Sequence, residues 1–257
     1  MKRWLPVAML LTGLALITTA PTVSAQEGIK LSWDNCQALG PGVLDKTYAC
    51  DLNTGSATFV ASYTAPDSVA LWTSTETTID LIVNSGAFPD WWRLRNQVGQ
   101  TGQCRNGALS ASQDFTGAPY AGVCSDTYLN QGAGGITSYT VGRDGPLTAR
   151  LTVTYSVPSA NQIPLNPGEE YFAVRATILY TKTIGSGSCA GCSLPVCIVL
   201  NGVRAIQPAG SPGGNVMITN PIPPATRTIT WQGGTGADCN MVPTKNHTWG
   251  QIKALYR

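Results

Sequence analysis

The stretch Leu147-Thr148-Ala149-Arg150-Leu151-Thr152-Val153-Thr154-Tyr155 alternates apolar and polar side chains along its length. Successive side chains of a β-strand point to opposite faces, so the apolar residues would enter a core while the polar ones face water. The stretch from Phe172 to Tyr180 repeats this alternation, with Arg175 and Thr177 on the polar face. Both patterns predict strands that each cover one side of a core.

Further strand-like stretches run along the chain, separated by turns rich in glycine and proline. They are Gly28–Trp33, Ala57–Thr64, Thr77–Asn84, Trp91–Leu94, Val196–Ile206, Val216–Thr219 and Thr226–Gln232. Helices do not alternate with these stretches, and no low-complexity linker divides the chain. We therefore expect one all-β domain over residues 26–257, folded as an antiparallel β-sandwich of the jelly-roll or immunoglobulin-like kind.

Residues 1–25 have the pattern of a cleavable export signal. Lys2 and Arg3 precede an apolar run from Trp4 to Ala20, and Val23-Ser24-Ala25 matches a small-residue cleavage site. We expect cleavage after Ala25 and a secreted, periplasmic or extracellular protein. No later apolar run reaches the roughly 18 residues that would predict a transmembrane segment.

Charge and histidine content exclude several classes of protein. The sequence has 16 Lys and Arg, 14 Asp and Glu and one histidine, and removal of Lys2 and Arg3 leaves 14 residues of each sign. Without a basic surplus, nucleic acid is not an expected partner. The single histidine, His247, excludes zinc sites that need two or three imidazoles. A serine triad would also require it, but its polar surroundings predict exposure to solvent.

Eight cysteines favour four disulfides in an oxidising compartment. They are Cys36, Cys50, Cys104, Cys124, Cys189, Cys192, Cys197 and Cys239. Because they are neighbours in sequence, we expect Cys36 to bond to Cys50 and Cys104 to bond to Cys124. One of the three cysteines at 189, 192 and 197 should then bond to Cys239, and the sequence does not say which.

The Cys189-Ala190-Gly191-Cys192 spacing permits two other interpretations. A CxxC can be a redox pair at a helix N-terminus, or half of a zinc site when a second close pair completes it. The segment lies between strand-like stretches, and no second CxxC follows. Structural disulfides are therefore the expectation, without metal or cofactor.

An aromatic segment, Phe88-Pro89-Asp90-Trp91-Trp92-Arg93, is the candidate ligand site. Adjacent strand residues point to opposite faces, so either Trp91 or Trp92 could face outward and stack on a sugar ring. Asp90 and Arg93 would then contact the sugar hydroxyls. The simpler alternative is that both rings are covered, one by the core and one by the loop from Cys104 to Cys124.

The segment Gly99–Gly135 contains this loop and shows no periodicity. A loop of that length is either functional or hides an element that the pattern does not reveal.

Carboxylates offer two weaker possibilities. A glycoside hydrolase needs two of them in one cleft. The glutamates are Glu27, Glu76, Glu169 and Glu170. Glu169 and Glu170 follow a turn and are expected to be solvated, and nothing in the sequence pairs them. Asp51 to Gly55 offers oxygens for calcium but lacks the later bidentate glutamate, so an Asx turn is the simpler expectation.

The C-terminal segment has a pattern of its own. Thr248 with Gln251 forms a capping box, and Trp249, Ile252 and Tyr256 share one helical face, which predicts a short closing helix with a terminal strand as the alternative. The ending Thr248-Trp249-Gly250-Gln251-Ile252-Lys253-Ala254-Leu255-Tyr256-Arg257 resembles the W-G-x-x-K-x-x-Y-R tails of secreted bacterial proteins of uncharacterised function. This resemblance implies export and carries no chemistry.

Taken as a whole, the sequence leads us to expect a non-catalytic protein with a structural or interaction role in the cell envelope or extracellular space. Its partner would be a glycan or another envelope protein. Two alternatives remain open: a carbohydrate-binding module that uses Trp91 or Trp92, and a glycoside hydrolase-like enzyme with two carboxylates.

Overall fold

The computed structural model describes residues 28–37, 42–65, 69–84, 86–220, 227–234 and 239. The expected export signal, Glu27, His247 and the tail from Thr248 to Arg257 lie outside this part. Among the described residues, no helix is both long enough and apolar enough to cross a membrane.

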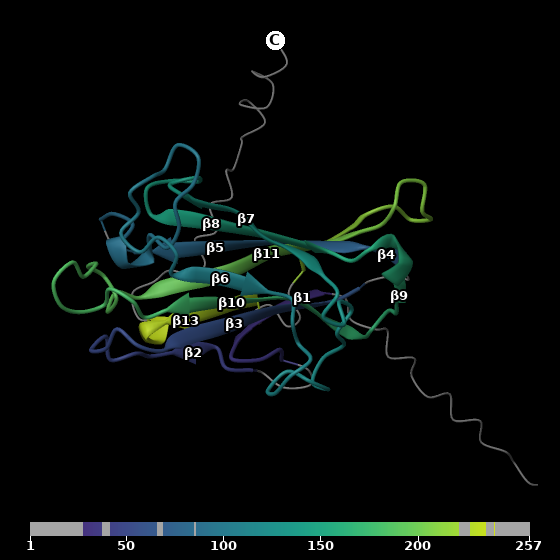
Figure 1. The fold of residues 1–257 in the computed structure, drawn as a ribbon, viewed down its shortest axis with the longest axis horizontal. Coiled ribbons are helices and arrows are strands. Elements are labelled where there is room, and N and C mark those ends of the chain that lie inside the picture. Colours follow the sequence, from purple (N-terminus) through teal and green to yellow (C-terminus); the bar gives the residue numbers. More distant parts are fainter. Residues whose placement is uncertain are drawn as a thin grey trace, which may run out of the picture.

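Two sheets pack on one continuous hydrophobic core, and most of their strands run along the long axis of the molecule (Figure 1). The four-stranded sheet has the order β1 (Gly28–Trp33), β3 (Ser56–Thr64), β10 (Glu170–Leu179) and β6 (Leu109–Ser112). The seven-stranded sheet has the order β2 (Asp45–Lys46), β13 (Thr228–Trp231), β11 (Val196–Ile206), β5 (Ser74–Val83), β8 (Thr148–Ser156) and β7 (Ala133–Val141), with β12 (Val216–Ile218) also on β11. The expected all-β sandwich is confirmed.

Smaller elements connect these strands. They are the pair β4 (Val69–Trp72) and β9 (Ile163–Leu165), and the 3-10 turns η1 (Asp90–Trp92), η2 (Ser159–Asn161) and η4 (Gln232–Gly234). Strand pairing is antiparallel throughout the described sheets except between β2 and β13.

The alternation that predicts β8 is confirmed, since Ala149, Leu151 and Val153 are buried in the core. In β10 the alternation is interrupted by a bulge. Phe172 aligns with Ser62 whereas Val174 aligns with Ala61, so these two residues point to opposite faces. Phe172 is therefore buried on the opposite face of β10 from Val174, where it stacks on Phe115 with ring centroids 4.0 Å apart.

One element prediction was wrong. Trp91–Leu94 is not a strand, because η1 occupies Asp90–Trp92. For the aperiodic segment Gly99–Gly135, the alternative of an element that the pattern does not reveal is confirmed, because the segment contains β6 and the start of β7. Strand formation depends on cross-strand neighbours more than on composition, and the segment Gly99–Gly135 forms strands although it is rich in glycine, serine and alanine.

The disulfide pairing also differs from the expected one. Cys36 bonds to Cys124, Cys50 to Cys192, Cys104 to Cys189 and Cys197 to Cys239. The expected Cys36–Cys50 and Cys104–Cys124 bonds are therefore wrong, whereas Cys239 does bond to one of the three crowded cysteines. The first three bridges join residues 88, 142 and 85 positions apart, because the sheets bring distant loops together. The two sulfurs of the CxxC each bond a different loop, so they do not form a redox pair.

Candidate functional site

The rings of Trp91 and Trp92 are fully buried, so the simpler alternative, that both rings are covered, is confirmed, and neither ring is open to stack on a sugar. Trp91 stacks against Trp231 with centroids 5.3 Å apart, and Trp92 meets the same ring edge-on at 5.6 Å. The backbone N–H of Trp91 donates to the carbonyl of Ala190 at 2.8 Å. The CxxC loop therefore packs against this turn, and the segment from Cys104 to Cys124 does so as well, through Arg105.

Asp90 and Arg93 stay near the surface and pair with each other, with Arg93 Nε 3.1 Å from Asp90 Oδ1. They flank a hollow of about 380 Å³ whose other walls include Pro89 and Leu194. Phe88 is the aromatic residue of this lining, and its side chain is buried. The hollow therefore lacks the open aromatic platform that sugar stacking needs.

Arg105, which the sequence did not single out, fixes this region from inside. Its buried guanidinium donates to the carbonyls of Trp91 at 2.7 Å and Thr181 at 2.8 Å, and also to that of Leu179. It lies 3.5 Å from the centroid of the Trp91 ring, a cation–π contact. Burial lowers the pKa of Arg105 to about 10. The residue is a structural link between loops.

The expectation that Glu169 and Glu170 are merely solvated was wrong. Glu170 accepts hydrogen bonds from Lys30 and Ser62, each at 2.6 Å. Glu169 accepts from Ser125 and, at 2.7 Å, from Tyr171, and these bonds hold the pKa of the Glu169 carboxyl below its usual range. Both carboxylates are thus engaged in contacts between structural segments.

In the possible calcium loop, Asp51 to Gly55, the side chain of Asn53 makes hydrogen bonds to another loop. The Asn53 side-chain oxygen accepts from the N–H groups of Thr183 at 2.7 Å and Ile184 at 3.0 Å. Its amide nitrogen donates to the Ile184 carbonyl at 3.1 Å. Asn53 therefore joins two loops, and its oxygen already has donors.

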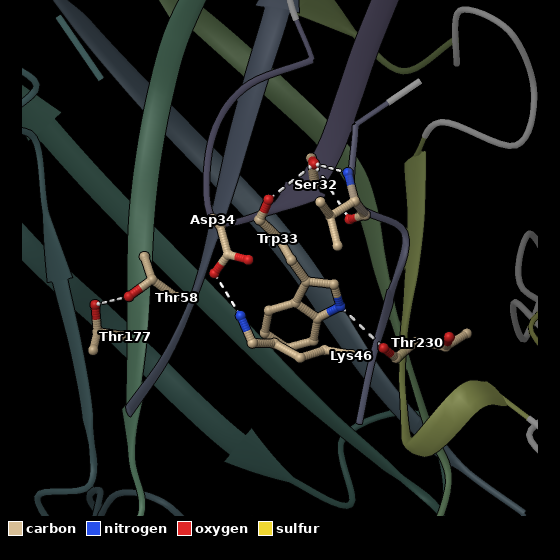
Figure 2. A network of polar contacts seen from close by, with 8 residues as sticks. Ser32, Trp33, Asp34, Lys46, Thr58, Thr177 and Thr230 are labelled. Atoms are coloured by element: carbon tan, nitrogen blue, oxygen red, sulfur yellow. Dashed lines mark hydrogen bonds and ion pairs between the residues drawn. The ribbon is translucent and has the colours of Figure 1, made fainter. Parts of the chain in front are cut away.

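The two sheets are tied together along one side, where β1 lies beside β2 and β13. Figure 2 shows the Trp33 indole of β1 donating to the Thr230 carbonyl of β13, at 3.0 Å. The Trp33 N–H donates to the Val43 carbonyl at 2.8 Å, and Lys46 pairs with Asp34. We call this side the closed seam.

The opposite side of the sandwich is open. β6 is the other edge of the four-stranded sheet and β7 the other edge of the seven-stranded sheet, and no hydrogen bond joins them in the described chain. A groove of about 640 Å³ lies between them. We call it the open seam; its lining is Arg95, Leu109, Ser110, Ala111, Ala133, Gly134, Gly135, Ile136, Thr137, Thr154, Tyr155 and Ser156.

On the β6 side, backbone groups point into this groove. The Leu179 N–H donates to the Ala108 carbonyl at 2.8 Å, and the same register pairs Thr177 with Ser110. Hydrogen bonding alternates along an antiparallel pair, so the residues between, Leu109 and Ala111, turn their N–H and C=O groups away from β10. Those groups face the open seam.

On the β7 side, a side chain already occupies part of the edge. The Gly142 N–H donates to the Thr148 carbonyl at 2.7 Å, and the alternation turns the backbone of Val141 outward. The Gln100 carboxamide donates to the Val141 carbonyl at 2.7 Å and accepts from its N–H at 3.0 Å. One amide side chain thus makes the two bonds that a neighbouring strand would make.

The two ends of the open seam are distinct. At one end Gln113 of the β6 side donates to the Gly132 carbonyl of the β7 side at 2.7 Å. At the other end lies Arg95, since its neighbour Asn96 donates its N–H to Asn106, shortly before β6 begins, at 2.8 Å. Gln113 follows β6 whereas Gly132 precedes β7, so the two strands run antiparallel across the seam.

No protein-family model and no curated protein matches this chain. The geometry of the seam therefore carries the functional argument.

The lining of the open seam suits binding. Its residues are small, apolar or hydroxyl-bearing, and Arg95 and Tyr155 are its titratable members. Burial raises the pKa of Tyr155, which keeps this phenol neutral. The lining contains no carboxylate pair of the kind that glycoside hydrolysis needs. What it offers is the edge of β6, where the register turns the backbone groups of Leu109 and Ala111 away from β10.

Proposed function

We propose that this protein is an exported, non-catalytic interaction module that binds an extended polypeptide strand along the edge of β6 that faces the open seam. The observation that carries the proposal is the orientation of Leu109 and Ala111, whose backbone groups face a groove of about 640 Å³. An added strand satisfies such groups with main-chain hydrogen bonds, while pockets for alternate side chains give specificity.

Where β10 extends beyond β6, its edge is covered by another segment of the chain. The uncovered edge of β6 is therefore a candidate binding surface. Beyond the end of β6, the Ser125 N–H donates to the Glu170 carbonyl at 2.9 Å, and the Phe172 N–H donates to the Ser125 carbonyl at 3.0 Å. Proteins generally block unused strand edges, because an unpaired edge invites aggregation. The middle of β6 has no such cover among the described residues.

The seam also indicates the pattern of its partner. Ala111 aligns with Ala176, a core residue, whereas Ser110 aligns with the partly exposed Thr177. A strand lying beside β6 would place alternate side chains toward the core and toward solvent. We therefore expect a partner segment that alternates apolar and polar residues. The four disulfides fit an extracellular or periplasmic location for this encounter.

The test is selection from a phage-displayed library of random linear octapeptides against the mature protein. Selected peptides should alternate apolar and polar residues. Ala111→Pro removes the N–H that faces the seam but leaves the bonds of Ser110 and Ser112 to β10, so it should weaken peptide binding about tenfold or more. The matched variant Ala111→Ser keeps the N–H and should bind normally.

Two outcomes would overturn the proposal. One is that selected peptides bind the Ala111→Pro variant as tightly as the parent, with both variants showing the same circular dichroism and unfolding temperature. The other is that no peptide is selected while the protein is retained on insoluble polysaccharide, which would favour carbohydrate binding instead.

A further inference from the structure

The geometry points to Arg95 as the residue that selects a carboxylate at one end of the strand bound in the open seam. This inference rests on the proposed function and adds the chemical group by which the partner is recognised. Its basis is the position of Arg95 at the end of the groove where β6 begins; among the described residues that line the seam, no other is charged.

The guanidinium of Arg95 is available to pair with a carboxylate of the partner, whereas those of Arg93, Arg105 and Arg150 already have partners within the protein. Arg93 pairs with Asp90, and Arg150 pairs with Asp80 at 2.6 Å. Arg105 is buried against backbone carbonyls. Arg95 is exposed, and no carboxylate within the described ranges lies within ion-pairing distance of it. A planar guanidinium in this position matches a carboxylate with two parallel hydrogen bonds.

The position of Arg95 fixes the direction of a strand that ends there. β6 starts at the Arg95 end of the seam and runs toward Gln113, while β7 starts near Gly132 and runs back. A strand whose C-terminus lies at Arg95 would therefore run antiparallel to β6 and parallel to β7. The antiparallel partner is then the strand whose Leu109 and Ala111 groups are unpaired. A carboxylate can also come from an aspartate or glutamate side chain, which leaves the direction open.

The experiment uses one octapeptide selected on the seam, synthesised with three endings: a free α-carboxylate, a carboxamide, and a carboxamide with aspartate as the last residue. Binding to the mature protein is measured by fluorescence polarisation with the parent, Arg95→Gln and Arg143→Gln. Arg143 is an exposed arginine outside the seam lining, so it controls for net charge.

We expect at least one carboxylate peptide to bind the parent about fivefold more tightly than the plain carboxamide, with the preference shrinking as salt is raised. The preference should vanish in Arg95→Gln and persist in Arg143→Gln. Tighter binding of the free α-carboxylate alone would place the C-terminus of the partner at Arg95, whereas tighter binding of the aspartate peptide alone would place a side chain there.

The inference and the proposed function fail in different ways. If the three peptides bind equally, or if Arg95→Gln keeps the preference, while Ala111→Pro still abolishes binding, the seam binds a strand but Arg95 does not select it. If no peptide depends on Ala111, both are overturned.

Discussion

Arg105 is a cation in the core, and its partners are the carbonyl oxygens of Trp91, Leu179 and Thr181, while no described carboxylate pairs with it. A buried charge is tolerated only when its hydrogen-bonding groups are satisfied, so the residue and its acceptors depend on each other. The sequence gives no sign of this arrangement, because an arginine in a glycine-rich segment ordinarily predicts a solvated side chain.

We expect Arg105→Met to lower the free energy of unfolding by about 3 kcal/mol, because the variant leaves buried carbonyls of Trp91 and Leu179 without donors. Guanidinium chloride unfolding, followed by tryptophan fluorescence, measures this change. Arg143→Met, at an exposed position, should stay within about 0.5 kcal/mol of the parent. Equal losses in the two variants would show that Arg105 contributes nothing specific.

Glu169 should contribute to the pH dependence of stability. Hydrogen bonds from Ser125 and Tyr171 lower its pKa in the folded protein. A carboxyl whose folded pKa is depressed stabilises the fold above its unfolded pKa, about 4.3, and that contribution is lost as the pH falls through the folded value. The difference in unfolding free energy between the parent and Glu169→Gln should therefore shrink below about pH 4. Tyr171→Phe, which removes one donor, should show a smaller change, and a constant difference at all pH values would contradict this assignment.

At the scale of single elements, the sequence predicts the strands whose two faces differ in polarity. β8 has one buried face and one more exposed face, so apolar and polar residues alternate along its sequence. β7 is an edge strand with glycines at 134 and 135, and neither face carries a readable pattern. The open seam could not be predicted for a related reason: it consists of backbone groups, which every sequence has, and of the way two edges meet in three dimensions.

The two glycines of β7 should respond differently to substitution. Gly134 has φ +148°, and a Cβ there would lie 2.1 Å from the Thr154 carbonyl oxygen; Gly135 has φ +157°, and a Cβ there meets no atom within 4 Å. Both alanine variants carry backbone strain, of about 1–3 kcal/mol, but Gly134→Ala also forces β7 away from β8. We expect Gly134→Ala to be the less stable variant in denaturant unfolding. The reverse order, or equal stability, would be inconsistent with the pairing of these strands.

At the scale of the whole molecule, the disulfides join loops that only the finished sandwich brings together. The sequence predicts that disulfides form, because eight cysteines follow an export signal pattern. The predicted bond between Cys36 and Cys50 is wrong, because proximity along the chain is the criterion available before the fold is known. The final location of each loop depends on the sheet order.

Proteolysis of the mature protein without reduction, followed by mass spectrometry, should yield the crosslinks Cys36–Cys124, Cys50–Cys192, Cys104–Cys189 and Cys197–Cys239. Titration of the denatured protein should find no free thiol. Replacing both Cys50 and Cys192 by alanine should lower the unfolding free energy by about 2–5 kcal/mol. A Cys36–Cys50 crosslink would contradict the arrangement of loops described above.

This connectivity has a consequence for biosynthesis. A chain that enters an oxidising compartment from its N-terminus exposes Cys36 and Cys50 first, and the native partners of both, Cys124 and Cys192, arrive much later. Early oxidation would join the wrong pair, and thiol exchange would have to undo it. The protein should therefore mature efficiently only where a disulfide isomerase accompanies the oxidase, and a host that supplies oxidase alone should accumulate scrambled, protease-sensitive forms.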